Sequence, residues 1–305
     1  MSTASDRWIV AAQRIAPVDA ILQRVHQMLA DTCPELVPHI LQREPLGLFG
    51  LASGFFYYPI ALQLELSGGD ESGVFELADG LALGHSYFYC LDRILDDGEV
   101  DYPMVLAAPI FLQEYLRIMA SLLPQHPSPQ STVQEWHAHY YAMYVSAQIY
   151  EWTTKRTLPD ITISDLNLLH KKSAPVCLPV RVVLEQQNLQ ERAPQLEDAF
   201  LTYSAGLQLV DDLSDVVADF RNGLSSIPLR LMLRQVLGLR VWPESSEVSP
   251  DDVRLLAAEP SLRSLILNLA ASYFNEASQK AENAGHPTLA HLSQFRYAWS
   301  AEQLI

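Results

Sequence analysis

Paired cysteines are missing from this chain of 305 residues. Its three cysteines, Cys33, Cys90 and Cys177, are odd in number and far apart, without a CxxC pair or a His/Cys group of the zinc-binding kind. Such residues are typical of free thiols in a reducing compartment, so we expect a cytoplasmic protein.

An excess of basic charge is also missing. Lys and Arg number 20 against 36 Asp and Glu, which gives a formal net charge of −16. Because this charge would repel a nucleic acid, we expect no nucleic-acid partner. An anionic ligand would need metal ions or a local cationic cluster to bind.

We expect neither a secretion signal nor a stable membrane span. Residues Met1 to Arg7 lack the basic region and apolar core of a signal peptide. Residues Leu46 to Leu64 are uncharged for 19 residues, which is the length of a membrane helix. Since this stretch also holds three glycines, a proline and two tyrosines, we interpret it as a buried core helix, with a membrane-associated lipid-binding protein as the alternative.

Strand patterns are nearly absent, whereas apolar residues return at three-and-four spacing through most of the chain. Val133 to Trp152, Leu166 to Leu184 and Leu262 to Ala281 show this period. Two further segments, Glu71 to Asp97 and Leu196 to Arg221, are apolar on nearly all sides, which is typical of helices inside a large bundle. The sequence therefore predicts an all-α fold, and no linker or repeat divides it.

An acidic cluster ends the first of these two long helices. Asp92 and Asp96 are four residues apart, and Asp97 follows. With a rise of 1.5 Å per residue, the Cα atoms of Asp92 and Asp96 lie about 6 Å apart on one face. Two carboxylates at that spacing can hold one or two hard cations such as Mg²⁺.

A second acidic cluster lies on the other long helix, about 115 residues further along. Asp211, Asp215 and Asp219 form a row with a period of four, and Asp212 stands beside the first. These acids would repel one another and have raised pKa values if they were buried without cations, and a divalent metal removes that difficulty. Either cluster alone would fit a solvated helix end, but two clusters on apolar helices predict one shared metal site facing a cavity.

These motifs resemble the class I isoprenoid synthases, the superfamily of trans-prenyltransferases and terpene synthases. Asp92 and Asp96 match the first and last acids of the family's DDxxD motif, with Arg93 at its second position. The segment from Gln208 to Asp215 matches the QxxDDxxD of the elongating enzymes, and with Asp219 it also matches the cyclases' NDLxSxxxE with aspartates substituted.

The resemblance implies one isoprenoid synthase domain over residues 1–305, folded as a single large helical bundle around a central apolar cavity. It implies a prenyl diphosphate substrate, three Mg²⁺ ions and, by analogy, a homodimer. The implied metal ligands are Asp92, Asp96, Asp97, Asp211, Asp212, Asp215 and Asp219. The implied catalytic residues are Asp92, Asp96, Asp211, Asp215 and Lys172.

Further motifs carry the resemblance toward the substrate. Gln148 and Glu151 are similar to the family's GQxxD element, and Lys172 stands where prenyltransferases have a KT pair. Arg296 and Tyr297 are similar to the RY pair of microbial cyclases. The residues expected to bind substrate are Gln148, Glu151, Lys172, Gln208, Arg221, Arg296, Tyr297, Phe88 and Tyr89.

The reaction subtype depends on the nucleophile that meets the allyl cation. The GKxxR cluster that binds isopentenyl diphosphate in elongating enzymes is not found, and Arg43 and His39 stand alone. We therefore rank first a terpene synthase that cyclises or rearranges a C15 to C25 prenyl diphosphate. The alternatives are a prenyltransferase with a non-isopentenyl acceptor, similar to the moenomycin-type farnesyltransferases, then a trans-prenyl diphosphate synthase, and lastly a non-catalytic partner subunit.

Overall fold

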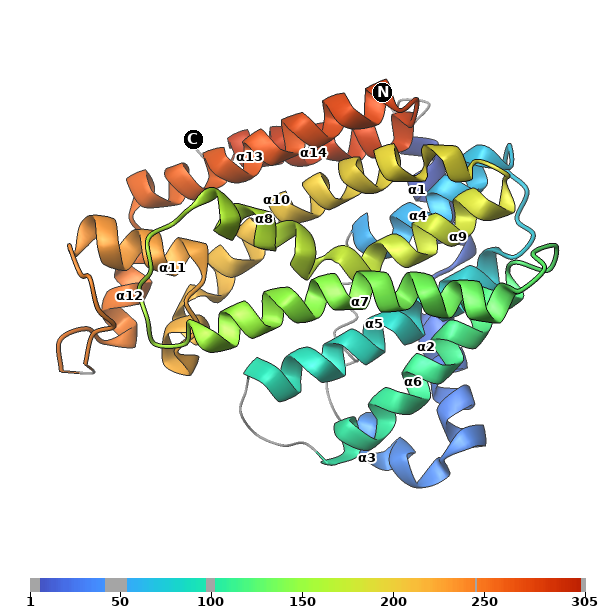
Figure 1. The fold of residues 1–305 in the computed structure, drawn as a ribbon, viewed down its shortest axis with the longest axis horizontal. Helices are drawn as coiled ribbons and strands as arrows, with labels where there is room; N and C mark the ends of the chain where they lie inside the picture. The colour runs from blue at the N-terminus through green and yellow to red at the C-terminus, as the bar shows by residue number, and fades with distance from the viewer. Residues whose placement is uncertain (1–5, 42–53, 97–101, 245, 303–305) are drawn as a thin grey trace. The chain divides into compact units, whose positions relative to one another are not determined.

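The computed structural model describes residues 6–41, 54–96, 102–244 and 246–302, and Figure 1 shows that they are almost entirely helical. They contain fourteen α-helices, and no strand occurs among these residues. The predicted all-α class is therefore confirmed. The chain divides into two compact units, unit 1 with Met1–Ala138 and Leu178–Pro194, and unit 2 with His139–Cys177 and Gln195–Ile305. The prediction of one domain over residues 1–305 stays a prediction.

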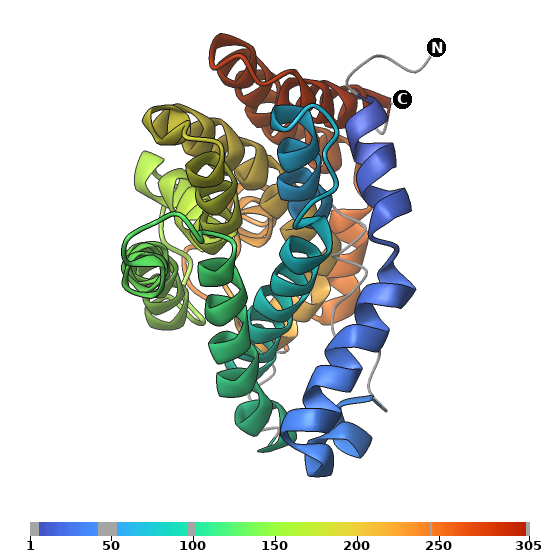
Figure 2. The same cartoon turned by 90° about the vertical axis from the view of Figure 1, so that its right-hand side faces the viewer.

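Unit 1 holds the N-terminal helices and the first acidic motif. Its elements are α1 (Asp6–Ile15), α2 (Val18–Thr32), α3 (Val37–Leu41), α4 (Gly54–Leu66), α5 (Val74–Asp96), α6 (Tyr102–Ser121), the start of α7 (Pro129–Thr153), nearly all of α9 (Cys177–Gln186), and the 3₁₀ turns Pro34–Leu36 and Gln190–Arg192. Figure 2 shows α1 and α2 in blue beside α4 and α5 in teal, and these helices are in contact.

The apolar stretch Leu46 to Leu64 reaches into α4. Its residues up to Ser53 lie outside the described part of the chain, and from Phe56 to Leu64 the side chains are buried. Among the described helices, none combines the length and the hydropathy needed to cross a membrane. For the described residues, the predicted buried core helix is confirmed.

Two glycines let α5 and α6 approach closely. A Cβ atom on Gly80 would lie 2.3 Å from Met119 Cε, and one on Gly84 would lie 3.0 Å from the ring of Tyr115. Because Gly80 and Gly84 are four residues apart, they open one face of α5 to α6. The helix begins at Val74 rather than at Glu71, since Gly73 has a φ of +73° that no right-handed helix accepts.

Unit 2 holds the second acidic motif. Its elements are the rest of α7, α8 (Ile163–Lys172), α10 (Ala193–Asn222, from Gln195 onward), α11 (Ile227–Leu231), α12 (Pro250–Ala257), α13 (Pro260–Asn283), α14 (Pro287–Glu302), the 3₁₀ turn Ala174–Val176 and a π-helical turn at Met232–Val236. Figure 1 shows α13 and α14 side by side, in red-orange and red. In unit 2, α13 also packs on α10, where the ring of Phe274 fills the space beside Gly206.

The segment from Leu166 to Leu184, which has helical spacing in the sequence, forms two helices rather than one. The chain breaks between α8, which ends at Lys172, and α9, which begins at Cys177. Pro175 lies in the break, where it cannot supply the N–H that a continuing helix needs. The break gives Lys172 the last position of α8.

Candidate active site

Four aspartates occupy one side of α10, in unit 2. Asp212 is buried, Asp219 is half-buried, and Asp211 and Asp215 are exposed. Gln208, one turn earlier, donates a hydrogen bond from Nε2 to Asp212 Oδ1 at 2.7 Å. The predicted row is therefore present as a continuous stripe on the helix, and we call these four residues the acid row.

The acid row has more negative charge than the nearby protein groups neutralise. Burial is the largest cause that raises the pKa of each member, to about 6 for Asp212 and to about 8 for Asp219. The side chains of Asp211 and Asp215 reach solvent, yet nearby protein atoms displace enough water to raise their pKa values as well. Mutual repulsion adds to the effect, since the charge of Asp215 raises the pKa of Asp211.

One cation opposes this excess of negative charge. Lys172, at the end of α8, lowers the pKa of all four aspartates of the acid row. Its Nζ atom also lies 2.7 Å from Oε1 of Glu151 on α7, and both side chains are largely buried, with 23% and 29% of their surface exposed. The structure therefore brings Lys172 and Glu151 together with the acid row, and their roles in substrate binding stay predictions.

The acid row suits magnesium ions that a diphosphate helps to hold. In the described part of the chain, no three His, Cys, Asp or Glu side chains converge on one point as a complete metal site. Mg²⁺ does not require such a cage, because it is commonly bound by one or two carboxylates together with water and substrate phosphates. Carboxylates about 6 Å apart along a helix, with raised pKa values, supply that kind of incomplete site.

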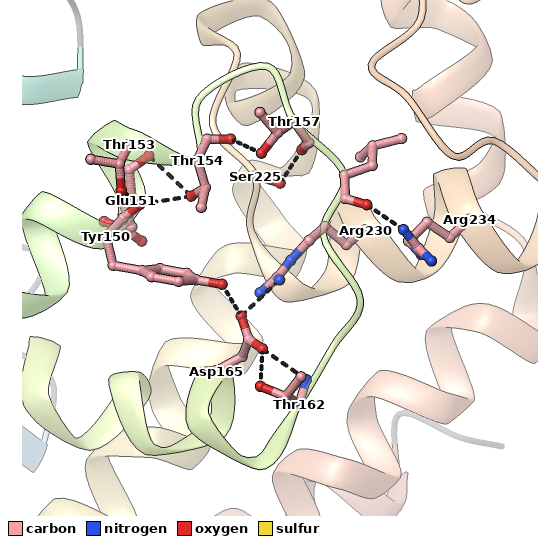
Figure 3. A network of polar contacts seen from close by, with 11 residues as sticks. Tyr150, Glu151, Thr153, Thr154, Thr157, Thr162, Asp165, Ser225, Arg230 and Arg234 are labelled. Atoms are coloured by element: carbon pink, nitrogen blue, oxygen red, sulfur yellow. Dashed lines mark hydrogen bonds and ion pairs between the residues drawn. The ribbon is translucent and has the colours of Figure 1, made fainter.

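A hydrogen-bond network around the buried pair Asp165 and Arg230 adjoins the acid row, and it was not predicted from the sequence. Asp165 Oδ1 accepts hydrogen bonds from Tyr150 at 2.5 Å and from Arg230 Nη1 at 2.7 Å, and Oδ2 accepts from the backbone N and Oγ1 of Thr162, each at 2.7 Å. Figure 3 shows these three residues pointing toward Asp165. Thr162, three residues before Asp165, forms a capping box with it, a pattern readable from the sequence, whereas nothing local identifies Arg230 as a partner.

The network keeps Asp165 ionised. Burial acts to raise the pKa of this carboxyl, but hydrogen bonds from Thr162, Tyr150 and Arg230 outweigh it and lower the pKa to about 2. Only 3% of the surface of each side chain of the Asp165–Arg230 pair is exposed. A small cavity of about 30 Å³ separates the network from the acid row. Its lining includes Tyr150, Glu151, Asp165, Lys172, Asp212, Ser226 and Arg230.

The first acidic motif lies at the end of α5, in unit 1. Asp92 is exposed there, and Phe88 and Tyr89, one turn earlier, are half-buried. The side chain of Asp96 is outside the described set, and Asp97 lies outside the described residues. A metal site shared between this motif and the acid row stays a prediction.

Two predicted substrate contacts lie away from the acid row. Arg221 follows Asp219 by two residues, so it points to nearly the opposite side of α10, where it lines an open hollow of about 750 Å³. The guanidinium of Arg296 lies 5.9 Å from the centre of the Trp299 ring and interacts with the hydroxyl of Tyr203. Tyr203 precedes Asp211 by eight residues, or about 12 Å along α10. Its neighbour Tyr297 is 46% exposed, and Gln148 is half-buried on α7.

No family model and no curated protein matches the sequence. Among solved structures, the chain is similar to a geranylgeranyl pyrophosphate synthase from Lactobacillus brevis, with 15% identity, a TM-score of 0.69 and coverage of 92% of this chain and 95% of the other. It is also similar to octaprenyl pyrophosphate synthase from Helicobacter pylori, at 12% identity, a TM-score of 0.65 and coverage of 92% and 97%.

A heptaprenyl diphosphate synthase from Staphylococcus aureus gives a similar result, with 13% identity, a TM-score of 0.64 and coverage of 94% of this chain and 96% of the other. All three neighbours are named as prenyl diphosphate synthases. At such low identity, the similarity establishes the fold. The resemblance to the class I isoprenoid synthases is thereby confirmed at the level of fold.

Proposed function

We propose that this protein is a magnesium-dependent prenyltransferase, which ionises a prenyl diphosphate at the acid row of α10 and passes the prenyl group to an acceptor. The single observation that carries the proposal is the set of four aspartates with raised pKa values around Lys172. A site of this kind binds a diphosphate only together with cations, and the fold is that of three prenyl diphosphate synthases.

The residues of unit 2 would divide the work of binding. Asp211 and Asp215 expose carboxylates to the ions, while Gln208 fixes the orientation of Asp212 through its hydrogen bond. Lys172 would donate hydrogen bonds to diphosphate oxygens from its compact ammonium group, which the ion pair with Glu151 holds in place. When bound, Mg²⁺ neutralises the negative charge that develops on the diphosphate leaving group.

Prenyl transfer replaces cyclisation as the first choice. The named activities of the neighbours support transfer between prenyl substrates, which the sequence analysis ranked below a terpene synthase. The RY pair was one argument for a cyclase, and Arg296 lies beside Tyr203 and Trp299. Isopentenyl diphosphate is the first acceptor to test, even though the sequence has no GKxxR cluster.

The test is a product analysis. The purified protein would be incubated with Mg²⁺ and, separately, C10, C15, C20 and C25 prenyl diphosphates, each with and without isopentenyl diphosphate, while released pyrophosphate and extracted products are measured. We expect release that requires the acceptor and yields a longer prenyl diphosphate. Cyclic hydrocarbon or alcohol without acceptor would restore the cyclase, and Mg²⁺-dependent binding without turnover would point to a different acceptor.

Absence of any diphosphate binding would overturn the enzyme proposal and favour a non-catalytic partner subunit. A cytoplasmic location and a homodimer remain predictions from the sequence. Gel filtration with light scattering would measure the oligomeric state in the same preparation.

A further inference from the structure

We propose that the buried Asp165–Arg230 pair is a positioning unit, which holds Lys172 and Glu151 in place beside the acid row. This inference rests on the proposed function, because Lys172 matters only if a diphosphate binds there. The Asp165 cluster, defined as Tyr150, Thr162, Asp165 and Arg230, lies wholly within unit 2. Figure 3 shows its members converging from three parts of the chain.

One carboxylate joins three helices. Tyr150 belongs to α7, Thr162 is the N-cap of α8, and Arg230 belongs to α11. The four hydrogen bonds that reach Asp165 are all between 2.5 and 2.7 Å long. The bond to Arg230 is buried and the other three are part-buried. Charge-assisted hydrogen bonds of this length restrict geometry, since a shift of one helix would break a bond to the ionised carboxylate.

The same helices carry the pair that faces the acid row. Asp165 and Lys172 are seven residues apart on α8, so they lie within about 20° of the same face and about 10 Å apart along the axis. On α7, Tyr150 is followed directly by Glu151, the ion-pair partner of Lys172. Both members of the Lys172–Glu151 pair are therefore attached to helices that Asp165 ties together.

A second set of contacts ties the segment between α7 and α8 to the segment that follows α10. The backbone N of Arg156 donates to the carbonyl of Gly223 at 2.8 Å, and Ser225 Oγ donates to the carbonyl of Thr157 at 2.7 Å. Arg234 reaches the carbonyl of Leu158 and the carboxylate of Asp160. These contacts begin immediately after the acid row, so the same framework fixes the end of α10 and the start of α8.

The charges of Asp165 and Arg230 do not act directly on the acid row. Asp165 already neutralises Arg230, and Lys172, not Arg230, is the cation that lowers the pKa values of the acid row. The Asp165 cluster would therefore act through Lys172 rather than on the diphosphate itself. The members of the cluster would therefore be positioning residues. A misplaced cationic group lowers the affinity for an anion even when the protein remains folded.

A double-mutant cycle tests this role with inorganic pyrophosphate and Mg²⁺ as the probe, measured by calorimetry on the full chain. The variants are Tyr150→Phe, Lys172→Ala and the two combined. Tyr150→Phe removes one hydrogen bond and keeps the ring and the buried ion pair, so it is safer for the fold than Arg230→Met. Tyr141→Phe, on the same helix and outside the cluster, is the matched control.

We expect Tyr150→Phe to weaken pyrophosphate binding about 10-fold when Lys172 is present and to have no effect once Lys172 is replaced by alanine, which is the signature of coupling. Tyr141→Phe should leave the affinity unchanged. Equal losses in both backgrounds, or no loss at all, would overturn the positioning role while the proposed function stands. If the unaltered protein binds no pyrophosphate with Mg²⁺, the proposed function fails and the positioning role fails with it.

Discussion

Lys172 Nζ lies 2.7 Å from Glu151 Oε1, and the same ammonium group is the cation that lowers the pKa of every aspartate in the acid row. Among the described residues, Lys172 thus interacts with five carboxylates, and the protein has a net charge of −16. This imbalance makes the site receptive to divalent cations and gives the protein several measurable properties.

Replacement of Lys172 should weaken diphosphate binding. We expect Lys172→Ala to reduce the affinity for pyrophosphate with Mg²⁺ by about 10- to 100-fold, because a hydrogen bond to a charged group contributes about 1.5–3 kcal/mol. Lys171→Ala is the matched control, since it removes the same charge from the adjacent position of α8. Equal losses in the two variants would show that total charge, rather than the position of Lys172, governs binding.

Loss of an acid-row carboxylate should stop the reaction and spare the fold. We expect Asp211→Ala, and likewise Asp92→Ala in the first motif, to lower pyrophosphate release by at least about 100-fold, the size of effect seen when one electrostatic stabiliser is removed from an active site. Asp251→Ala, at a site that is 79% exposed on α12, serves as the control. Unfolding of the Asp211 variant at low temperature, followed by circular dichroism, would contradict the assignment.

Stability without metal should fall as the pH rises from about 4 to about 8. The folded protein holds protons on Asp212 and Asp219 up to pKa values of about 6 and about 8, whereas the unfolded chain releases them near 3.8. The folded state therefore binds more protons in this window, so the free energy of unfolding decreases with pH. The measurement is the urea midpoint in EDTA at pH 5, 6.5 and 8.

The variant Asp219→Asn should flatten that pH dependence, and Mg²⁺ with pyrophosphate should raise the urea midpoint most at pH 8. Asp165 does not interfere with the comparison. Because its pKa is lowered to about 2, its stabilising contribution is complete above about pH 4 and is lost only as the pH falls toward 2. An unchanged slope in Asp219→Asn would mean that this carboxyl is ionised in the folded protein.

Packing between α10 and α13 should be sensitive to one methyl group. A Cβ atom on Gly206 would lie 2.7 Å from the ring of Phe274, so we expect Gly206→Ala to lower the free energy of unfolding by about 1–3 kcal/mol. The double variant with Phe274→Leu should recover part of this loss because the ring is gone. Additive losses in urea unfolding would show that the two residues do not collide.

The sequence by itself determined the helical class and the acid row. Both follow from short-range periodicity: apolar spacing of three and four predicts helices, and aspartates at 211, 215 and 219 share a side of any helix that contains them. Even the excess negative charge of the row was predictable, since four acids within one apolar segment must either repel one another or bind cations.

The tertiary structure decided which distant groups meet. Asp165 and Arg230 are 65 residues apart, and their pairing depends on how α8 and α11 pack, which no local pattern encodes. The same holds for Arg296, whose partner Tyr203 is chosen by the packing of unit 2 rather than by the RY dipeptide. A helix period fixes the face on which a residue lies, but only the packed chain determines what lies opposite that face, because burial and hydrogen bonding are satisfied between segments rather than within them.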